Sequence, residues 1–305
     1  MEIIGQQMVN GITLGGLYAL IALGYTLVYG ILLLINFAHS EMFMTGAYVG
    51  YFTLNGLSKI EFFTASSGGL LLLYVIAFLA GMIATGLLGM LTERFAYRPL
   101  RNAPRLAPLI SAIGVSLFLQ NAALLWISSR SIPFPVLFEI RQFDIGGVNV
   151  SSMQILIVGS TILLLLVLDT FVSKTRVGKA MRAVSQDRDA AGLMGVNINY
   201  IIALTFFIGP ALGGAAGMFS GMYYGNIKYN MGFIPGIKSF TAAVIGGIGN
   251  LRGAMLGGFT LGMIEALAAG FISTGYKDVI AFAILILVLV FKPGGLLGES
   301  VVEKV

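Results

Sequence analysis

The sequence predicts an all-α integral membrane protein, and three features of its composition support that prediction. Hydrophobic residues occupy 57% of the 305 positions, charged residues only 10%, and the mean hydropathy is +0.93. A soluble domain carries roughly 25% charged residues, because its surface must be solvated. Glycine fills 41 positions, about twice its usual share of roughly 7%, and glycine lets membrane helices approach closely. An exterior this poor in charge must face lipid.

Apolar segments follow one another along the chain, and a spanning helix needs about 20 such residues. Gly236–Ile248 is short, and Met42–Leu57 follows a polar interruption at Asn36–Glu41, so we expect half-helices or broken helices there. In total we expect eight, at most nine, transmembrane or broken helices in one membrane domain spanning residues 1–305. The segments are Val9–Leu34, Met42–Leu57, Gly69–Leu91, Leu106–Ile127, Met153–Leu168, Tyr200–Tyr224, Gly236–Ile248, Gly253–Phe271 and Val279–Phe291.

The net charge of +5 is concentrated in loops. Nine of the 18 Lys and Arg residues fall in Glu93–Arg105 and Ser173–Arg188, as in loops that obey the positive-inside rule. We therefore place both stretches in the cytoplasm, the loop Ser128–Ser152 outside, the N-terminus outside and the tail from Lys292 inside. The same distribution argues against nucleic acid as a partner. No Lys or Arg precedes Lys59, so the first apolar segment is expected to remain as a membrane helix rather than to be cleaved.

Motifs of enzymes and cofactor sites are missing from the sequence. There is no cysteine and one histidine, which excludes disulfides, thiolate metal sites and zinc sites built from several histidines. Neither a G-x-x-x-x-G-K-[ST] phosphate loop nor a G-x-S-x-G nucleophile motif occurs. We expect no catalytic residues, no metal and no cofactor in this chain.

A ladder of glycines four residues apart is the strongest local pattern. At 3.6 residues per turn its members fall close to one helix face, and Pro210 in the same segment should kink the helix. One interpretation is close helix packing. The other is a face that slides or lines a pathway. The ladder comprises Gly209, Gly213, Gly217 and Gly221, with Gly225 as a fifth member.

A second glycine cluster interrupts an apolar run at Gly246, Gly247, Gly249 and Asn250. Broken helices at membrane depth often flank the substrate sites of transporters, although packing alone would also explain the glycines. Glu265 is a lone acid in the apolar segment that follows, and it must face a partner, water or another subunit.

The third cluster, Asn36-Phe-Ala-His-Ser-Glu41, holds the only histidine. A structural interpretation makes Ser40 the cap of the next helix, with Glu41 in its first turn. A functional interpretation places Asn36, His39 and Glu41 as polar groups at the mouth of a translocation path. Both interpretations remain open at this point.

The long cytoplasmic segment 173–199 is charged and rich in Ala and Met, which predicts short helices outside the bilayer. Ser185 could cap a helix whose first turn includes Asp187. A solvated basic loop would explain the charges, but a docking surface for another protein would also explain the apolar residues. Candidate docking residues are Arg182, Asp187, Asp189, Ala191, Leu193, Met194 and Gly195.

Four stretches together resemble the branched-chain amino acid permease family of bacterial ATP-binding-cassette (ABC) importers, nearly end to end. One departure is Ser40, where that family would be expected to have glycine. The stretches are NGITLGGLYALIALGYTLVYGILLLINFAHSEMFMTGAYVG (Asn10–Gly50), ERFAYRPLRNAP (Glu93–Pro104), GKAMRAVSQDRDAAGLMGVN (Gly178–Asn197) and AAVIGGIGNLRGAMLGG (Ala242–Gly258).

The resemblance implies a multi-pass permease subunit in the bacterial cytoplasmic (inner) membrane. It would pair with a second permease and two P-loop ATPase subunits, which use the ATP, and an extracytoplasmic binding protein would deliver substrate. Residues 178–197 would couple the permease to an ATPase, and transport would proceed by alternating access. Urea, short amides or other amino acids are alternative substrates within the same machinery.

Two functions of other classes also remain. An ion-coupled secondary transporter or channel would need buried ionisable groups, for which only Glu41 and Glu265 are candidates. The second is a membrane scaffold without transport, and co-purification with two ATPases would distinguish the importer from both.

Overall fold

The computed structural model describes residues 2–101, 103–104, 106–292 and 294–298; Arg105, counted above among the basic loop residues, lies outside them. Each predicted apolar segment lies wholly or mostly within a helix, which confirms the all-α membrane fold. Among the described residues, seven helices are long and apolar enough to cross a membrane; α2, with 19 residues, and α10, with 14, are not among them. The helices are α1 (Glu2–Leu32), α2 (His39–Leu57), α4 (Ser67–Thr92), α5 (Leu106–Trp126), α6 (Ser152–Lys174), α9 (Ile198–Tyr224), α10 (Phe233–Gly246), α11 (Leu251–Phe271) and α12 (Lys277–Phe291).

Shorter elements fill the connections between these helices. The loop predicted to be external contains strands that we did not predict. Of these, β2 and β3 form an antiparallel hairpin whose two-residue turn, Gly146-Gly147, has φ of +64° and +85°, the conformation that glycine pairs favour in tight hairpins. The short elements are α3 (Glu61–Thr64), η1 (Glu93–Tyr97), η2 (Arg98–Leu100), β1 (Ile132–Pro133), β2 (Gln142–Ile145), β3 (Val148–Ser151), α7 (Arg176–Gln186), α8 (Arg188–Leu193), β4 (Asn226–Ile227) and η3 (Thr274–Tyr276).

The chain forms two compact units. Unit 1 comprises residues 1–33, 140–202 and 237–305, and unit 2 comprises residues 34–139 and 203–236. Helices α9 and α10 each begin in one unit and end in the other.

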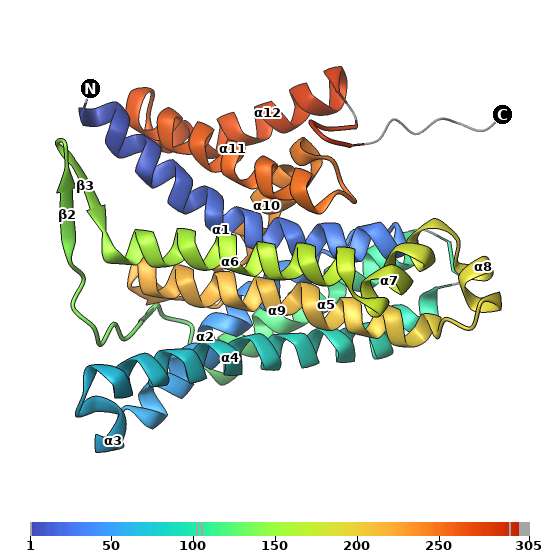
Figure 1. Cartoon of the computed structure of the whole chain (residues 1–305), viewed down its shortest axis with the longest axis horizontal. Coiled ribbons are helices and arrows are strands. Elements are labelled where there is room, and N and C mark those ends of the chain that lie inside the picture. Colours follow the sequence, from blue (N-terminus) through green and yellow to red (C-terminus); the bar gives the residue numbers. More distant parts are fainter. Residues whose placement is uncertain (1, 102, 105, 293, 299–305) are drawn as a thin grey trace. The chain divides into compact units, whose positions relative to one another are not determined.

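In unit 1, α1 lies along α11, and glycines make the contact (Figure 1). A Cβ added at Gly262 would lie 2.2 Å from the backbone N of Gly15, and one at Gly258 would lie 2.5 Å from the Cα of Ala19. No side chain fits in such a space, so the two backbones are in direct contact. This is the packing mode of small-residue membrane interfaces.

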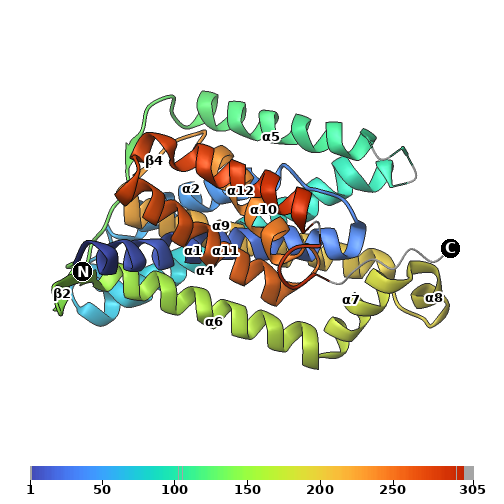
Figure 2. The same ribbon diagram turned by 90° about the horizontal axis from the view of Figure 1, so that it is seen from above.

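Helix α6 runs beside α1 in the same unit (Figure 2). It begins with a capping box, in which Ser151 and Gln154 satisfy each other's backbone N–H groups. The end of α6 leads into α7 and α8, so short helices occur where the composition of segment 173–199 predicted them.

In unit 2, the glycine ladder faces α2 from α9. A Cβ at Gly217 would lie 1.7 Å from the carbonyl oxygen of Phe43, and one at Gly213 would lie 3.3 Å from Cε1 of His39. The backbone of α9 therefore rests directly on α2 at Gly217.

The outer members of the ladder lie in different surroundings. A Cβ at Gly221 would lie 2.8 Å from the ring of Phe134, whereas Gly209 is buried within α9. Gly225 falls just beyond the helix at φ +68°, a left-handed conformation common where helices end. The packing face thus runs along α9 and stops before Gly225.

Two predicted helix caps are wrong. Ser40 lies inside α2, which already begins at His39, with Ala38 at the cap position. Ser185 lies inside α7, and the cap of α8 is Asp187, whose Oδ1 accepts a 2.9 Å hydrogen bond from the Ala190 N–H. In the first case the helix begins one residue before the predicted cap, and in the second case it begins after the predicted cap.

Candidate functional site

Glu41 is fully buried in the first turn of α2, and the donors that reach its carboxylate all meet one oxygen. Oε1 accepts from Ser40 Oγ at 3.1 Å, from Ser116 Oγ at 3.0 Å and from Gln120 Nε2 at 2.8 Å. Within the described residues Oε2 has no hydrogen-bond partner, and no Lys or Arg there forms an ion pair with this carboxylate. Neutral donors alone therefore serve Glu41 in that part of the chain.

Helix geometry brings these donors together. Ser116 and Gln120 are four residues apart in α5 and so lie on one face of that helix. Ser40 is fixed from another side, since a Cβ at Gly236 would lie only 2.4 Å from its Cβ. Neither Ser116 nor Gln120 was predicted to be a site residue, although a polar pair at this spacing in an apolar helix is a detectable signal.

Asn36 and His39 lie near Glu41 in sequence but have other surroundings. Asn36 sits in the break between α1 and α2, and its Oδ1 accepts a 2.6 Å hydrogen bond from the Tyr97 hydroxyl. His39, the first residue of α2, is completely buried beside Gly213. The three predicted pathway residues thus belong to one buried segment but have different neighbours.

The interruption at Gly246–Asn250 forms the turn between α10 and α11. Gly247 and Gly249 have φ of +104° and +97°, which favours glycine. Asn250 caps α11 by accepting a 3.0 Å hydrogen bond from the Gly253 N–H. A Cβ at Gly246 would lie 1.9 Å from the Gly253 carbonyl oxygen. Close backbone packing and capping account for this cluster locally.

Glu265 belongs to a charge network in unit 1 in which Glu265 and Lys238 are buried and Asp278 and Lys277 are partly exposed. Lys238 Nζ, from α10, lies 2.7 Å from Glu265 Oε1 and also pairs with Asp278 at the start of α12. The Tyr18 hydroxyl of α1 donates a 2.8 Å hydrogen bond to Glu265 Oε2. Lys277 Nζ lies 3.9 Å from Glu265 Oε1. Two acids and two bases thus meet where α10, α11 and α12 come together, and α1 adds a hydroxyl.

Of the three surroundings considered for Glu265, the structure shows a charged partner, Lys238. Only 2% of the Lys238 side chain is exposed, and its ammonium also lies 5.9 Å from the centre of the Tyr18 ring. Lys238 was not predicted as a site residue. Its signal was a single charge within the apolar segment Gly236–Ile248.

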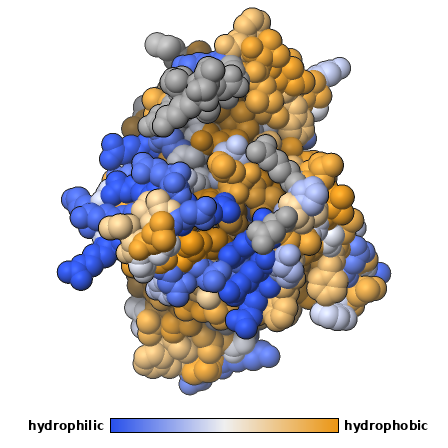
Figure 3. Space-filling model, turned by 90° about the vertical axis from the view of Figure 1, so that its right-hand side faces the viewer, coloured by the Kyte–Doolittle hydropathy of each residue, from blue (hydrophilic) through white to orange (hydrophobic). Residues whose placement is uncertain are grey.

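The surface of α7 and α8 combines charge with two exposed apolar side chains. Leu193 is 90% and Met194 85% exposed, and Figure 3 shows hydrophilic residues gathered around a few hydrophobic ones on the face where these helices lie. Ala191, in contrast, is buried. Of the apolar docking residues that we predicted, only Leu193 and Met194 are exposed.

The polar candidates on this surface differ in role. Asp187 caps α8, and Asp189 is exposed. Gly195 follows α8 at φ +85°. Arg182 donates a 3.1 Å hydrogen bond to the Ser173 carbonyl, which ties α7 back to the end of α6.

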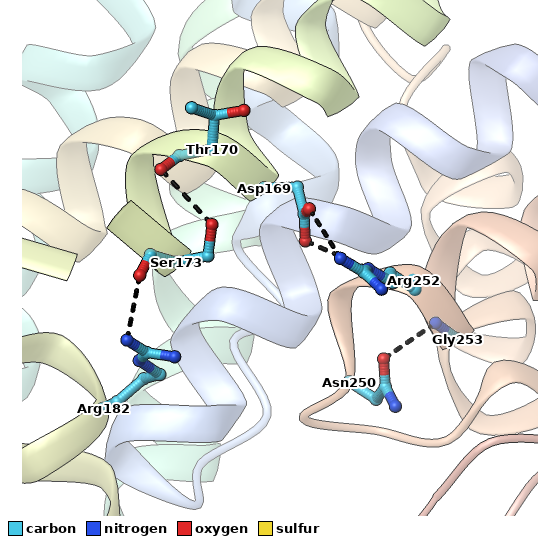
Figure 4. Close-up of polar contacts among 7 residues, drawn as sticks. All are labelled: Asp169, Thr170, Ser173, Arg182, Asn250, Arg252 and Gly253. Atoms are coloured by element: carbon cyan, nitrogen blue, oxygen red, sulfur yellow. Dashed lines mark hydrogen bonds and ion pairs between the residues drawn. The ribbon is translucent and has the colours of Figure 1, made fainter. Parts of the chain in front are cut away.

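Figure 4 shows this anchoring together with a second tie between α6 and the start of α11. Arg252 pairs with Asp169 through two hydrogen bonds of 3.0 and 3.3 Å. The end of α6 is therefore joined to the start of α11, and α7 and α8 follow directly from this joined end of α6.

Among the described residues, no group of three or more His, Asp and Glu side chains is placed to hold a metal ion. The site consists of buried carboxylates, close helix contacts and one exposed surface.

Comparison with known proteins identifies the family of this chain. Residues 7–289 match the family described as the permease component of branched-chain amino acid transport systems. The chain is 49% identical to the high-affinity branched-chain amino acid transport system permease protein BraD of Pseudomonas aeruginosa, over 98% of this chain and 97% of that protein. It is 46% identical to the corresponding LivH protein of Escherichia coli K12, with the same coverage. No solved structure matches significantly.

Proposed function

This chain belongs to the family of branched-chain amino acid transport permeases, and from that premise we propose that it forms the membrane path of an ATP-driven importer. The substrate is a branched-chain amino acid, and the location is the bacterial cytoplasmic membrane. The observation that carries the proposal is the 46–49% identity to high-affinity permeases along nearly the whole of both chains. The complete importer also contains a second permease, two P-loop ATPases and an extracytoplasmic binding protein.

The exposed surface at the end of α8 supports an ATPase as partner. Leu193 and Met194 expose apolar side chains within a charged segment that the sequence places outside the bilayer. Buried apolar anchors surrounded by polar residues are typical of protein interfaces. The chain itself has no phosphate-binding loop, so energy must reach it through a contact of this kind.

The ATPases drive alternating access through that contact. When they close on ATP, α7 and α8 move with them. The hydrogen bond from Arg182 to the end of α6 and the ion pair of Arg252 with Asp169 pass this movement to α6 and α11 of the same unit. A branched-chain amino acid has an apolar side chain and a zwitterionic head, so a largely apolar passage with few polar groups suits it.

Leu193→Asp tests the coupling contact. A charge placed in an apolar interface without a partner costs several kcal/mol, so the ATPases should no longer co-purify with the permease. Uptake of radiolabelled leucine should also be lost in cells that express the whole importer. Because Leu193 is exposed, the variant should insert and fold normally.

Ser185→Asp is the matched control, because it adds the same charge at an exposed position of α7 away from the apolar pair. It should retain uptake and ATPase binding. Normal uptake by a well-expressed Leu193→Asp protein would contradict the coupling role.

A further inference from the structure

The carboxyl group of Glu41 has no cationic partner among the described residues of unit 2. Its Oε1 accepts three hydrogen bonds, more than the two lone pairs of one oxygen ideally serve, while Oε2 has no hydrogen-bond partner in that set. Neutral donors solvate a carboxylate but leave its charge in place. A buried carboxylate in a membrane protein is costly unless a cation pairs with it.

Within the part of the chain that the structure describes, no basic side chain supplies that cation. Arg101, a basic residue of unit 2, is paired with Glu93 instead. The described residues also lack a cluster of acidic and histidine side chains that could hold a metal ion at Glu41. A single carboxylate oxygen with fixed orientation suits an organic cation that brings its own hydrogen-bond donors.

We propose that Oε2 of Glu41 binds the α-ammonium group of the amino acid during its passage, an inference that rests on the proposed transport function. An ammonium group carries three N–H donors and one positive charge, so it satisfies both the hydrogen bonding and the charge of this oxygen. Such charge-assisted bonds are about twice as strong as neutral ones.

Ser116 and Gln120 act as positioning residues in this proposal. By holding Oε1 from one face of α5, they fix the rotation of the carboxylate and so the direction of Oε2. Because Glu41 is fully buried in this structure, the ammonium reaches it only in a state of the transport cycle in which the surrounding helices have separated.

Three ligands test the proposal on the complete purified importer in detergent without its binding protein. Leucine carries the side chain, the ammonium and the carboxylate. Isoamylamine lacks the carboxylate, and 4-methylpentanoate lacks the ammonium. Each raises the thermal unfolding midpoint only if it binds the folded protein. The variants are Glu41→Gln, which keeps the shape and the acceptor oxygen, and Glu139→Gln, which makes the same change at an exposed carboxylate.

Leucine and isoamylamine should raise the midpoint of the wild type and of the control variant Glu139→Gln, whereas 4-methylpentanoate should not. In Glu41→Gln, the concentration of leucine and of isoamylamine that gives half the shift should rise roughly tenfold or more, because a bond to a charged group is lost. The same concentrations in Glu139→Gln should equal those of the wild type.

Three results would overturn the proposal: an unchanged leucine response in Glu41→Gln, a 4-methylpentanoate response equal to that of isoamylamine, or no response of the wild type to any of the ligands. Leucine uptake by the wild-type importer in vesicles, with its binding protein present, tests the proposed function separately. Uptake without an ammonium-dependent response would leave the transport function standing and remove Glu41 from it.

Discussion

Two buried glutamates lie in separate units of the chain, and their surroundings differ in charge. Glu265 in unit 1 has Lys238 on one oxygen and Tyr18 on the other. Glu41 in unit 2 has neutral donors on one oxygen and no hydrogen-bond partner within the described residues on the other. Glu265 therefore holds helices together through a satisfied ion pair, whereas Glu41 keeps an acceptor for a group that arrives from outside.

The largest expected effect comes from Lys238→Ala, which leaves Glu265 buried without its ammonium partner. Removing one partner of a buried pair costs about 3–5 kcal/mol, so the thermal unfolding midpoint of the purified protein should fall sharply. Glu41→Gln should lower the midpoint far less, because Glu41 has no cation to lose. An equal fall of the midpoint in the two variants would show that Glu265 does not depend on a cationic partner more than Glu41 does.

Gly217→Leu should have the next largest effect, since it acts on the helix that packs against the one carrying Glu41. Its Cβ would lie 1.7 Å from the carbonyl oxygen of Phe43, so α9 and α2 must separate, at a cost of about 3 kcal/mol. The control is Gly159→Leu, where a Cβ meets nothing within 4 Å. The thermal unfolding midpoint and the rate of leucine uptake should both fall in Gly217→Leu and stay unchanged in Gly159→Leu.

Tyr18→Phe and Ser116→Ala each remove one hydrogen-bond donor, the first from Glu265 and the second from Glu41. Tyr18→Phe leaves one oxygen of Glu265 without its donor, which costs about 1.5–3 kcal/mol. Ser116→Ala leaves two donors on Oε1 of Glu41, so its loss should be about 1 kcal/mol. The thermal unfolding midpoints of the two variants measure this difference. A larger fall of the midpoint for Ser116→Ala would show that Glu41, and not Glu265, depends more on a single donor.

Asp169→Asn should have the smallest effect. Arg252 is 70% exposed, and exposed pairs are screened by water and salt. No measurable shift of the unfolding midpoint is expected. A shift comparable to that of Lys238→Ala would show that the tie between α6 and α11 is not a surface contact.

The helices could be predicted from sequence because their signal is local. Apolar runs located each main helix from α1 to α12, and the glycines at Gly247 and Gly249 located the break between α10 and α11. The strands were missed because they are short and mostly exposed, and their only clear signal was the pair Gly146-Gly147.

Apart from Ser40, which is next to Glu41, the partners of the two buried glutamates could not be predicted, because they are distant along the chain. Ser116 is 75 residues from Glu41, and Lys238 is 27 residues from Glu265. One sequence offers no information on which polar residue of one helix meets which residue of another. The cap at Ser40 failed for a local reason, since α2 begins before the position that such a cap requires.

The contact between α1 and α11 has a consequence for biosynthesis. Helix α1 ends at Leu32 and its partner α11 begins at Leu251, so more than two hundred residues are added between the two helices during synthesis. At about 5–20 residues per second, roughly 10–40 seconds separate the two helices during synthesis. Throughout that interval the glycine face of α1 has no α11 to pack against, so lipid or the insertion machinery must cover it. Slowed translation upstream of Leu251 should therefore increase degradation of the nascent chain, at a stage that no substitution in the finished protein would reveal.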